Sequence, residues 1–222
     1  TVTVVNKVIT VDFGTGIVCL DGRTRSGKLI YDFSTSASGA MFYRNPGFIM
    51  KVSSQNYVVE GYAINIINKT ITNTTPPTIP SGTNPGTNLT WAITANVSIT
   101  RPNGGTISWT CSRTKELINT SDSLCYRGQN LHIIWSLAKV KLNGTTTGTN
   151  ANNETFSATA TNLVRDFSCS PVTLRPMRHP FISGTLVYTP GSRPTRTIDF
   201  GTGTCDALAT LTINNRTFSI TL

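Results

Sequence analysis

Few side chains in this sequence are of the types that catalyse reactions. The 222 residues contain ten carboxylates and two histidines. Glycoside hydrolysis needs two carboxylates that face each other, and Asp32, Glu60 and Asp166 are candidates for such a pair only by elimination. A serine or cysteine nucleophile needs an oriented base, but His132 lies in an apolar run and His179 in a basic segment next to a proline. We therefore expect that the protein is not an enzyme.

The five cysteines offer cross-linking chemistry and indicate an oxidising compartment. No Cys-x-x-Cys pair and no histidine-rich cluster is present, so we expect neither a metal site nor a cofactor. Cys111 and Cys125 flank a short polar stretch between two strand-like runs, and we expect a disulfide that closes this loop. We expect a second disulfide between Cys169 and Cys205, with free buried thiols as the alternative for all four residues. Cys19 is then free, bonded to a residue outside this chain, or linked to a neighbouring molecule.

Aromatic and basic residues suggest only weak binding functions. Trp91, Trp109 and Trp135 could stack on sugars, although tryptophans in central strands more often belong to the core. The net charge of +9 comes from a shortage of acids and not from a dense basic tract. Nucleic-acid binding is therefore not expected, whereas weak attraction to acidic glycans or to a negatively charged cell surface is plausible.

The elements that must position these side chains are strands. Serine and threonine together number 57, about a quarter of the chain, and strong helix formers are scarce. Threonine, valine and isoleucine pack well on a pleated surface. The composition predicts an all-β fold, either an antiparallel β-sandwich or an extended meander with disulfides. We expect a single domain over residues 1–222, with a possible subdivision at the proline-rich loop 73–86.

Two kinds of turn signal punctuate the predicted strands. The string Asp-Phe-Gly-Thr-Gly occurs at 12–16 and again at 199–203, each time after a strand-like run and before a cysteine. Its glycines permit positive φ, so each copy is predicted to turn the chain sharply at the end of a strand. The pair Asn214-Asn215 between two alternating runs predicts an antiparallel hairpin.

Both ends of the sequence alternate between apolar and hydroxyl residues. Phe218, Ile220 and Leu222 alternate with Ser219 and Thr221 near the end, and the start alternates in the same way, through Thr1, Val2, Thr3 and Val4. Terminal residues fray unless a sheet holds them, so both ends are predicted to be strands. Pairing within their own sheet is one possibility. The other is that an end strand completes the open sheet edge of a neighbouring molecule.

Glycan attachment is suggested by several short motifs. Asn-x-Ser/Thr triplets occur eight times, a weak excess over chance, and the candidates include Asn68, Asn73, Asn88, Asn143 and Asn153. Asp122-Ser123-Leu124 also fits the loose pattern of O-glycosylation in Bacteroidota, which makes Ser123 a further candidate.

The signals for location point outside the cell. The first residues are neither a charged n-region nor a signal core, and no stretch approaches the ~18 apolar residues that cross a bilayer. We expect a mature, exported, soluble form without a transmembrane segment.

The ordered motifs resemble those of a known family. The segment 191–206, with Arg-Pro-Thr-Arg-Thr-Ile-Asp-Phe-Gly-Thr-Gly-Thr-Cys-Asp at its end, and the following 209–214 are similar to the end of a family of exported, often lipoprotein-like proteins of Bacteroidota. The similarity extends to 9–14, to 21–23 with 25–28, to 106–110, and to 163–165 before Cys169. This mostly uncharacterised family implies export and residence at the cell surface, and no activity. Its members tend to carry another cysteine just before the strand near Thr1, which here is missing or lies upstream of the given sequence, and this leaves the partner of Cys19 open.

These observations together predict a structural, extracellular or cell-surface protein. We expect it to associate with itself, as a homo-oligomer or as the subunit of a fibre joined by β-strand addition. The alternative is a monomeric surface module that binds glycans or adheres to surfaces.

Overall fold

The protein is almost entirely β-structure, as predicted. The computed structural model describes residues 1–76, 88–127, 130–169 and 180–221. Strands account for 63% of the structure and helices for 4%. Within these residues no helix is both long enough and apolar enough to cross a membrane.

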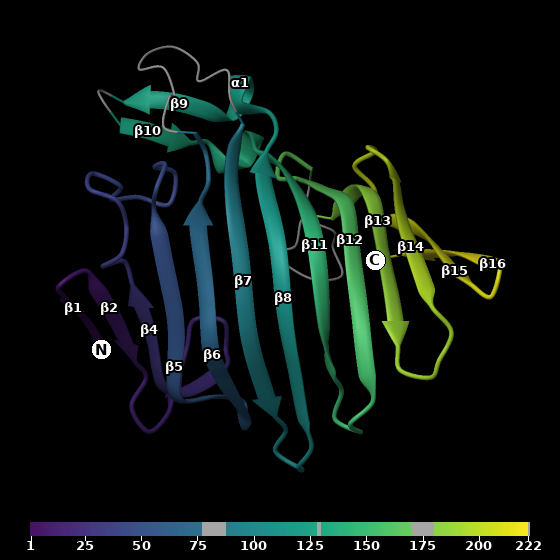
Figure 1. The fold of residues 1–222 in the computed structure, drawn as a ribbon, viewed down its shortest axis with the longest axis horizontal. Coiled ribbons are helices and arrows are strands. Elements are labelled where there is room, and N and C mark those ends of the chain that lie inside the picture. The colour runs from purple at the N-terminus through teal and green to yellow at the C-terminus, as the bar shows by residue number, and fades with distance from the viewer. Residues whose placement is uncertain (77–87, 128–129, 170–179, 222) are drawn as a thin grey trace.

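Fourteen strands form one antiparallel sheet (Figure 1). Apart from β3 (Ile17–Val18), which pairs with β4, their spatial order follows the chain: β1 (Val2–Val5), β2 (Val8–Asp12), β4 (Thr24–Asp32), β5 (Ile49–Val59), β6 (Tyr62–Asn73), β7 (Leu89–Thr100), β8 (Thr106–Leu117), β11 (Lys139–Thr149), β12 (Thr155–Asp166), β13 (Phe181–Pro190), β14 (Arg196–Thr202), β15 (Leu208–Ile213) and β16 (Arg216–Thr221). The prediction of an extended antiparallel meander is confirmed. Because β6 and β7 are neighbours, the sheet continues across the proline-rich segment between them.

A small excursion interrupts the meander between β8 and β11. It contains α1 (Thr120–Ser123), the two-stranded hairpin of β9 (Leu124–Arg127) and β10 (Asn130–Ile133), and the 3-10 turn η1 (Trp135–Leu137). In Figure 1 this hairpin lies beyond the ends of β5 and β6, beside the end of β7.

Two-residue turns close the hairpins at both ends of the sheet. Asn6 and Lys7 have φ of 49° and 63° between β1 and β2, and Asn214 and Asn215 have φ of 49° and 60° between β15 and β16. Positive φ at both central residues is the mark of the type I′ turn, whose twist matches that of the strands. The hairpin predicted at Asn214-Asn215 is therefore confirmed.

The repeated Asp-Phe-Gly-Thr-Gly string makes the same turn in both copies. Oδ1 of Asp12 accepts a hydrogen bond from the N–H of Gly14 at 2.8 Å, and Oδ1 of Asp199 accepts one from Gly201 at 2.9 Å. An aspartate that bonds the backbone two residues on holds a tight turn. The following phenylalanines pack inward, with Phe200 buried. The first copy follows the end of β2, as predicted, but the second lies inside β14, which continues to Thr202 after a shift in register opposite β13. The prediction of a turn at a strand end is therefore wrong for the second copy.

The two faces of the sheet differ in chemistry. Residues that lie directly opposite each other in the ladder share a face. Leu89, Leu117 and Val140 form such a row across β7, β8 and β11 and belong to the main core. On the other face, one row across five strands consists only of hydroxyl residues: Thr70, Thr94, Ser112, Thr145 and Thr159. The high threonine content therefore supplies the polar face of the sheet.

The main core lies between the sheet and the segment that joins β4 to β5. Tyr43 in that segment stacks on Trp91, with ring centroids 4.7 Å apart. The carbonyl oxygen of Tyr43 accepts hydrogen bonds from the indole N–H of Trp91 at 2.8 Å and from the side chain of Asn73 at 3.1 Å. A second core forms near the other end of the sheet around Leu163, Phe200 and Ala209.

One of the two predicted disulfides is present. Cys169 and Cys205 are bonded, with their Cα atoms 5.4 Å apart, and the bridge ties the end of β12 to the loop before β15. Cys111 and Cys125 are free, so the prediction of a bridge between them is wrong. Cys111 lies in mid-sheet opposite Ala95, and β8 continues from there to Leu117. The distance along β8 from Cys111 to Leu117 is about 20 Å at the usual rise of a strand, so Cys111 lies far from the end of β8 that leads to Cys125.

Candidate assembly edges

Among the described residues, β1 and β16 are the first and last strands in the order of the large sheet. All of β1 is exposed, and all of β16 except Ile220. The sequence predicted strands at both ends, and both pair within the sheet through their hairpins. No described residue pairs with the outer side of either strand. Leu222 lies outside the described residues.

The hairpin geometry fixes which backbone groups point outward. Thr1 and Asp12 exchange hydrogen bonds, with N···O distances of 2.6 and 2.8 Å. In an antiparallel pair, bonded and non-bonded positions alternate. The N–H and C=O groups of Val2 and Val4 therefore point away from the sheet. The same alternation, counted from the turn at Asn214-Asn215, directs the groups of Thr217, Ser219 and Thr221 outward.

The first edge also exposes apolar side chains. Six of them gather on β1, on β3 and in the loop after β3: Val2, Val4, Val5, Ile17, Val18 and Leu20. Beside them lies a groove of about 680 Å³, whose lining includes Val11, Phe13, Cys19 and Arg25. Successive strand residues point to opposite faces, so Val5 lies on the other face from Val2 and Val4. Exposed apolar residues gathered at a groove, as Val2, Ile17, Val18 and Leu20 are, commonly mark an interaction surface.

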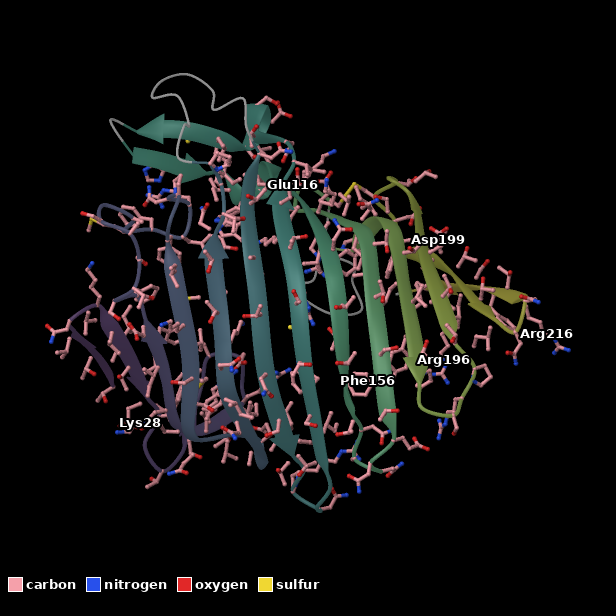
Figure 2. All side chains as sticks on the ribbon, in the orientation of Figure 1. Lys28, Glu116, Phe156, Arg196, Asp199 and Arg216 are labelled. Carbon is pink, nitrogen blue, oxygen red and sulfur yellow. A yellow bond between two sulfur atoms is a disulfide. The ribbon has the colours of Figure 1, made fainter. Side chains whose placement is uncertain are left out.

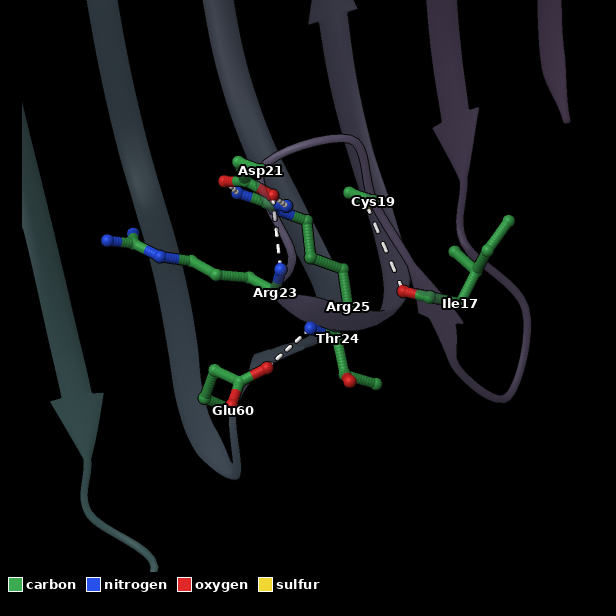
Figure 3. Close-up of polar contacts among 7 residues, drawn as sticks. All are labelled: Ile17, Cys19, Asp21, Arg23, Thr24, Arg25 and Glu60. Carbon is green, nitrogen blue, oxygen red and sulfur yellow. Dashed lines mark hydrogen bonds and ion pairs between the residues drawn. The ribbon is translucent and has the colours of Figure 1, made fainter. Parts of the chain in front are cut away.

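Figure 3 shows the polar contacts that fix the wall of this groove. Asp21 receives two hydrogen bonds of 2.7 Å from the guanidinium of Arg25 and one of 3.3 Å from the N–H of Arg23. The bonds from Arg25 hold the pKa of Asp21 well below its usual range. Glu60 accepts a hydrogen bond from the N–H of Thr24. The loop is therefore tied to the start of β4 and to the turn after β5.

Cys19 lies in this wall as a free, half-buried thiol. Its Sγ is 3.9 Å from the carbonyl oxygen of Ile17, and it has no disulfide partner among the described residues. All three alternatives given by the sequence stay open: a free thiol, a bond to a residue outside this chain, and a link to a neighbouring molecule.

The second edge has a smaller hollow. Its volume is about 250 Å³, and it is lined by Asp199, Phe200, Asp206, Leu208 and Ser219, among others. Leu208 and Phe218 are exposed beside it. Figure 2 places Asp199 and Arg216 at this end of the sheet and Lys28 at the other end. Each hollow is thus lined by one copy of the repeated Asp-Phe-Gly-Thr-Gly turn.

The two edge strands run in the same direction. The path through the sheet has thirteen strands once β3 is set aside, and every neighbouring pair is antiparallel. An odd number of alternating strands leaves the first and last parallel to each other. Ladder rows place Val4 on the face that carries Ile9, and Phe218 on the face that carries Leu211, Ile198 and Leu186. Successive cross-strand pairs place both rows on the same face of the sheet, and both hydrophobic cores lie on that face.

The carboxylates are committed to structural contacts. Six of the seven aspartates accept a hydrogen bond from a backbone N–H two residues on: Asp12, Asp21, Asp32, Asp166, Asp199 and Asp206. The three glutamates bond to Thr24, to Asn88 and Lys141, and to Asn150. These contacts account for nine of the ten acids, including the candidates Asp32, Glu60 and Asp166.

One trio of potential metal ligands occurs in the described part of the chain. Atoms of Asp166, Cys169 and Cys205 lie within 4.8 Å of one another. The two sulfur atoms are joined as a disulfide, and the carboxylate of Asp166 is bonded to Ser168 and Lys139. These groups therefore serve the structure of the second half of the sheet.

Two predicted glycosylation positions are wrong. Ser123 is fully buried, and its hydroxyl donates to the carbonyl oxygen of Asn119 at 2.7 Å. Asn73 is 2% exposed, and both ends of its amide are bonded, to Tyr43 and Thr75. Neither side chain can accept a glycan in this fold.

The remaining candidates differ in access. Asn88 is half-buried and donates to Glu116 at 2.6 Å, and Asn143 is half-buried and accepts from the N–H of Asn162 at 2.7 Å. Asn68 and Asn153 are exposed. Attachment at these exposed positions remains a prediction.

The three tryptophans also lie in different settings. Trp91 is 1% exposed and belongs to the core, and Trp109 is half-buried on β8. Trp135 is 42% exposed. Of the three, Trp135 is thus the one able to meet a ligand in solution.

Sequence reasoning missed Ile17, Val18, Leu20 and Leu208 as parts of the edges. Its strand signal was a run of several residues, whereas β3 contains two. The only sequence signal for β3 was the apolar pair Ile17 and Val18, which follows Gly16 and precedes Cys19. Comparison with known protein families, with curated proteins and with solved structures found no match for this chain.

Proposed function

We propose that this protein is the repeating structural subunit of an extracellular fibre. Copies would join through their sheet edges, with β16 of one copy pairing with β1 of the next. The observation that supports this most directly is that both edges of one continuous sheet present outward backbone groups with no described partner. Unpaired strand edges are templates for pairing with another chain.

The form of assembly follows from the two edges being different surfaces. A contact between different surfaces of identical subunits generates a ring if the rotation closes and an open filament if it does not. Because β1 and β16 run in the same direction, the joint is parallel when the core-bearing faces of successive copies are continuous. Val2 and Val4 then continue the apolar face begun by Phe218 and Ile220.

Charge favours the edges as the contact. A net charge of +9 makes copies repel one another, but β1 carries no charged side chain and β16 carries only Arg216. The contact surfaces themselves are therefore nearly uncharged. We expect assembly to strengthen as salt screens the repulsion between the rest of the subunits.

The chemistry of the chain suits this role outside a cell. The commitment of nine carboxylates to turns and ion pairs supports a function without catalysis. The Cys169–Cys205 bridge suits an oxidising environment. Residence at the cell surface is also what the resemblance to exported proteins of Bacteroidota implies.

Ser219→Pro tests the proposal. The N–H of Ser219 points outward, so proline removes one edge donor without removing a bond of the β15–β16 ladder. Ser219→Ala keeps that donor and is the matched control. We expect filaments of the natural protein and of Ser219→Ala in electron micrographs, and dispersed particles of Ser219→Pro with the same circular dichroism spectrum. Monomeric natural protein at all concentrations, or undiminished filaments of Ser219→Pro, would refute the proposal.

A further inference from the structure

A small pocket lies where the β4–β5 segment meets the β9–β10 excursion. It has a volume of about 260 Å³ and is lined by Tyr43, Arg44, His132, Ile133 and Trp135. Pockets for drug-sized ligands measure about 300–1,000 Å³. This one is therefore of a size for a single sugar ring. It lies away from both edge strands in the fold, so it is independent of the proposed assembly.

The pocket carries the positive charge of the Arg44 guanidinium. Arg44 and His132 line it, and no carboxylate is among the described residues of its wall. The buried Nε atom of Arg44 has no hydrogen-bond partner in the described part of the chain. The guanidinium also lies over the ring of Phe42, 4.2 Å from its centroid. Arg44 forms no ion pair with a described residue, so an anionic group in the pocket would supply the missing counter-ion.

A second cation lies behind Trp135. Lys115 Nζ is 5.0 Å from the centroid of the Trp135 ring, 5.4 Å from that of Tyr43 and 5.5 Å from that of Trp91. It donates to the hydroxyl of Tyr43 at 3.4 Å, and no described carboxylate lies within ion-pair distance. Lys115 therefore adds positive potential to a wall made of aromatic rings.

The framework of the pocket is rigid. Tyr43 is stacked on Trp91, and its carbonyl oxygen is held by Trp91 and Asn73. Trp135 packs edge-on against Phe167, with ring centroids 5.9 Å apart. The exposed ring of Trp135 is thus held in place beside Arg44 and His132, which is the arrangement expected of a preformed ligand site.

We infer that this pocket binds a carboxylate-bearing sugar, that is, a uronic acid residue of an acidic glycan. The ring of Trp135 supplies an apolar platform for the sugar face. The guanidinium of Arg44 supplies a charge-assisted partner for the carboxylate, for which the planar fork of arginine is suited. Neutral sugars lack the group that would satisfy Arg44, and small carboxylates lack the ring that would cover Trp135.

Calorimetric titration with sodium glucuronate and with its uncharged methyl ester tests this inference. We expect saturable binding of glucuronate, at least tenfold weaker binding of the ester, and no competition by equal concentrations of acetate. Equal binding of acid and ester, equal competition by acetate, or absence of glucuronate binding would each overturn the inference.

Substitutions of Arg44 and Trp135 test whether glucuronate binds in this pocket. Arg44→Gln should remove the difference between acid and ester, and Trp135→Ala should weaken glucuronate binding at least tenfold. Trp135→Phe keeps an aromatic platform and should restore part of the affinity, which separates loss of the ring from loss of the fold. Trp109→Phe, on the far part of β8, is the matched control and should bind as the natural protein does. Discrimination that survives in Arg44→Gln, or full affinity in Trp135→Ala, would refute the assignment.

Discussion

Asp12 and Asp199 make the same backbone contact near opposite ends of one sheet. Each carboxylate accepts a hydrogen bond from the glycine N–H two residues on, at 2.8 and 2.9 Å. Each turn then lines the hollow beside one sheet edge. The repeated sequence therefore forms the same local contact in two settings, after the end of β2 and inside β14.

The Asp12 turn predicts a difference between two substitutions. Asp12→Ala removes the acceptor for Gly14 and the ion pair with Lys28, whereas Asp12→Asn keeps the acceptor. We expect Asp12→Ala to lower the free energy of unfolding, because the Gly14 N–H loses its hydrogen-bond acceptor. Asp12→Asn should lose less. Urea unfolding of both variants measures the difference, and equal losses would contradict this role of the turn.

Removal of the disulfide should have a large effect. Cys169 and Cys205 are 36 residues apart, and closing a loop of that size in the unfolded chain corresponds to about 4 kcal/mol. The double variant Cys169→Ser and Cys205→Ser should therefore unfold at a clearly lower urea concentration, while Cys19→Ser should not change the midpoint.

Thiol titration checks the same assignment independently. In denaturant without reductant we expect three reactive thiols per chain, from Cys19, Cys111 and Cys125. A single thiol would mean that Cys111 and Cys125 are bonded after all.

Asp166 predicts a dependence of stability on pH. Burial alone would raise the pKa of Asp166, but hydrogen bonds from Ser168 and Lys139 outweigh it, and the net pKa is lowered. A carboxylate whose pKa is lower in the folded than in the unfolded state stabilises the folded protein at pH values above its unfolded-state pKa, which is near 4. This stabilisation is lost as the pH falls through the folded-state pKa. The natural protein should therefore lose stability on acidification below about pH 4.

Asp166→Asn is the matching variant. It should be less stable at pH 7 by about 1–3 kcal/mol, because it weakens the contacts with Ser168 and Lys139. Its unfolding midpoint should also change less between pH 6 and pH 3. An acid dependence as steep as that of the natural protein would show that other carboxylates carry it.

The ladder shifts register at Gly27 in β4 and at Gly184 in β13, and at both places a glycine with positive φ lies against the backbone of an asparagine. Gly27, with φ of 76°, lies against the backbone of Asn56, and Gly184, with φ of 92°, lies against Asn162. A Cβ atom at Gly27 would come within 2.0 Å of the carbonyl oxygen of Asn56. We expect Gly27→Ala to cost more than about 2 kcal/mol of stability. Gly104→Ala is the control, because Gly104 has φ of 86° but open space around it, so only the backbone strain of roughly 1–2 kcal/mol applies.

Much of the fold could be predicted from local sequence chemistry. The β-branched composition, the asparagine pair at 214–215 and the aspartate turn after β2 each act within a few residues, and these appear as predicted. The bridge from Cys169 to Cys205 was also predicted.

The errors arose where distant packing decides the outcome. The polar run after Cys111 suggested a loop, but Arg113 and Lys115 extend from β8 on the face that carries Trp91, and the long side chain of Lys115 reaches the aromatic rings of the core. Ser123 suggested an exposed position, but α1 is folded so that this residue is fully buried. Neither contact has a signal within a short window of sequence.

The direction of the edge strands gives the sharpest prediction for assembly. If successive copies pair β16 with β1 and keep their core-bearing faces continuous, the strands are parallel, and Val4 of one copy lies opposite Phe218 or Ile220 of the next. Strands in a pair lie about 4.8 Å apart, which is within the Cα range of a disulfide.

In a Cys19→Ser background, Val4→Cys combined with Ile220→Cys or Phe218→Cys should therefore give a ladder of covalent oligomers on non-reducing gels. Thr3→Cys with Ile220→Cys should not, because Thr3 lies on the opposite face. A two-fold arrangement of copies would instead cross-link Val4→Cys alone into dimers, and that result would exclude the head-to-tail joint.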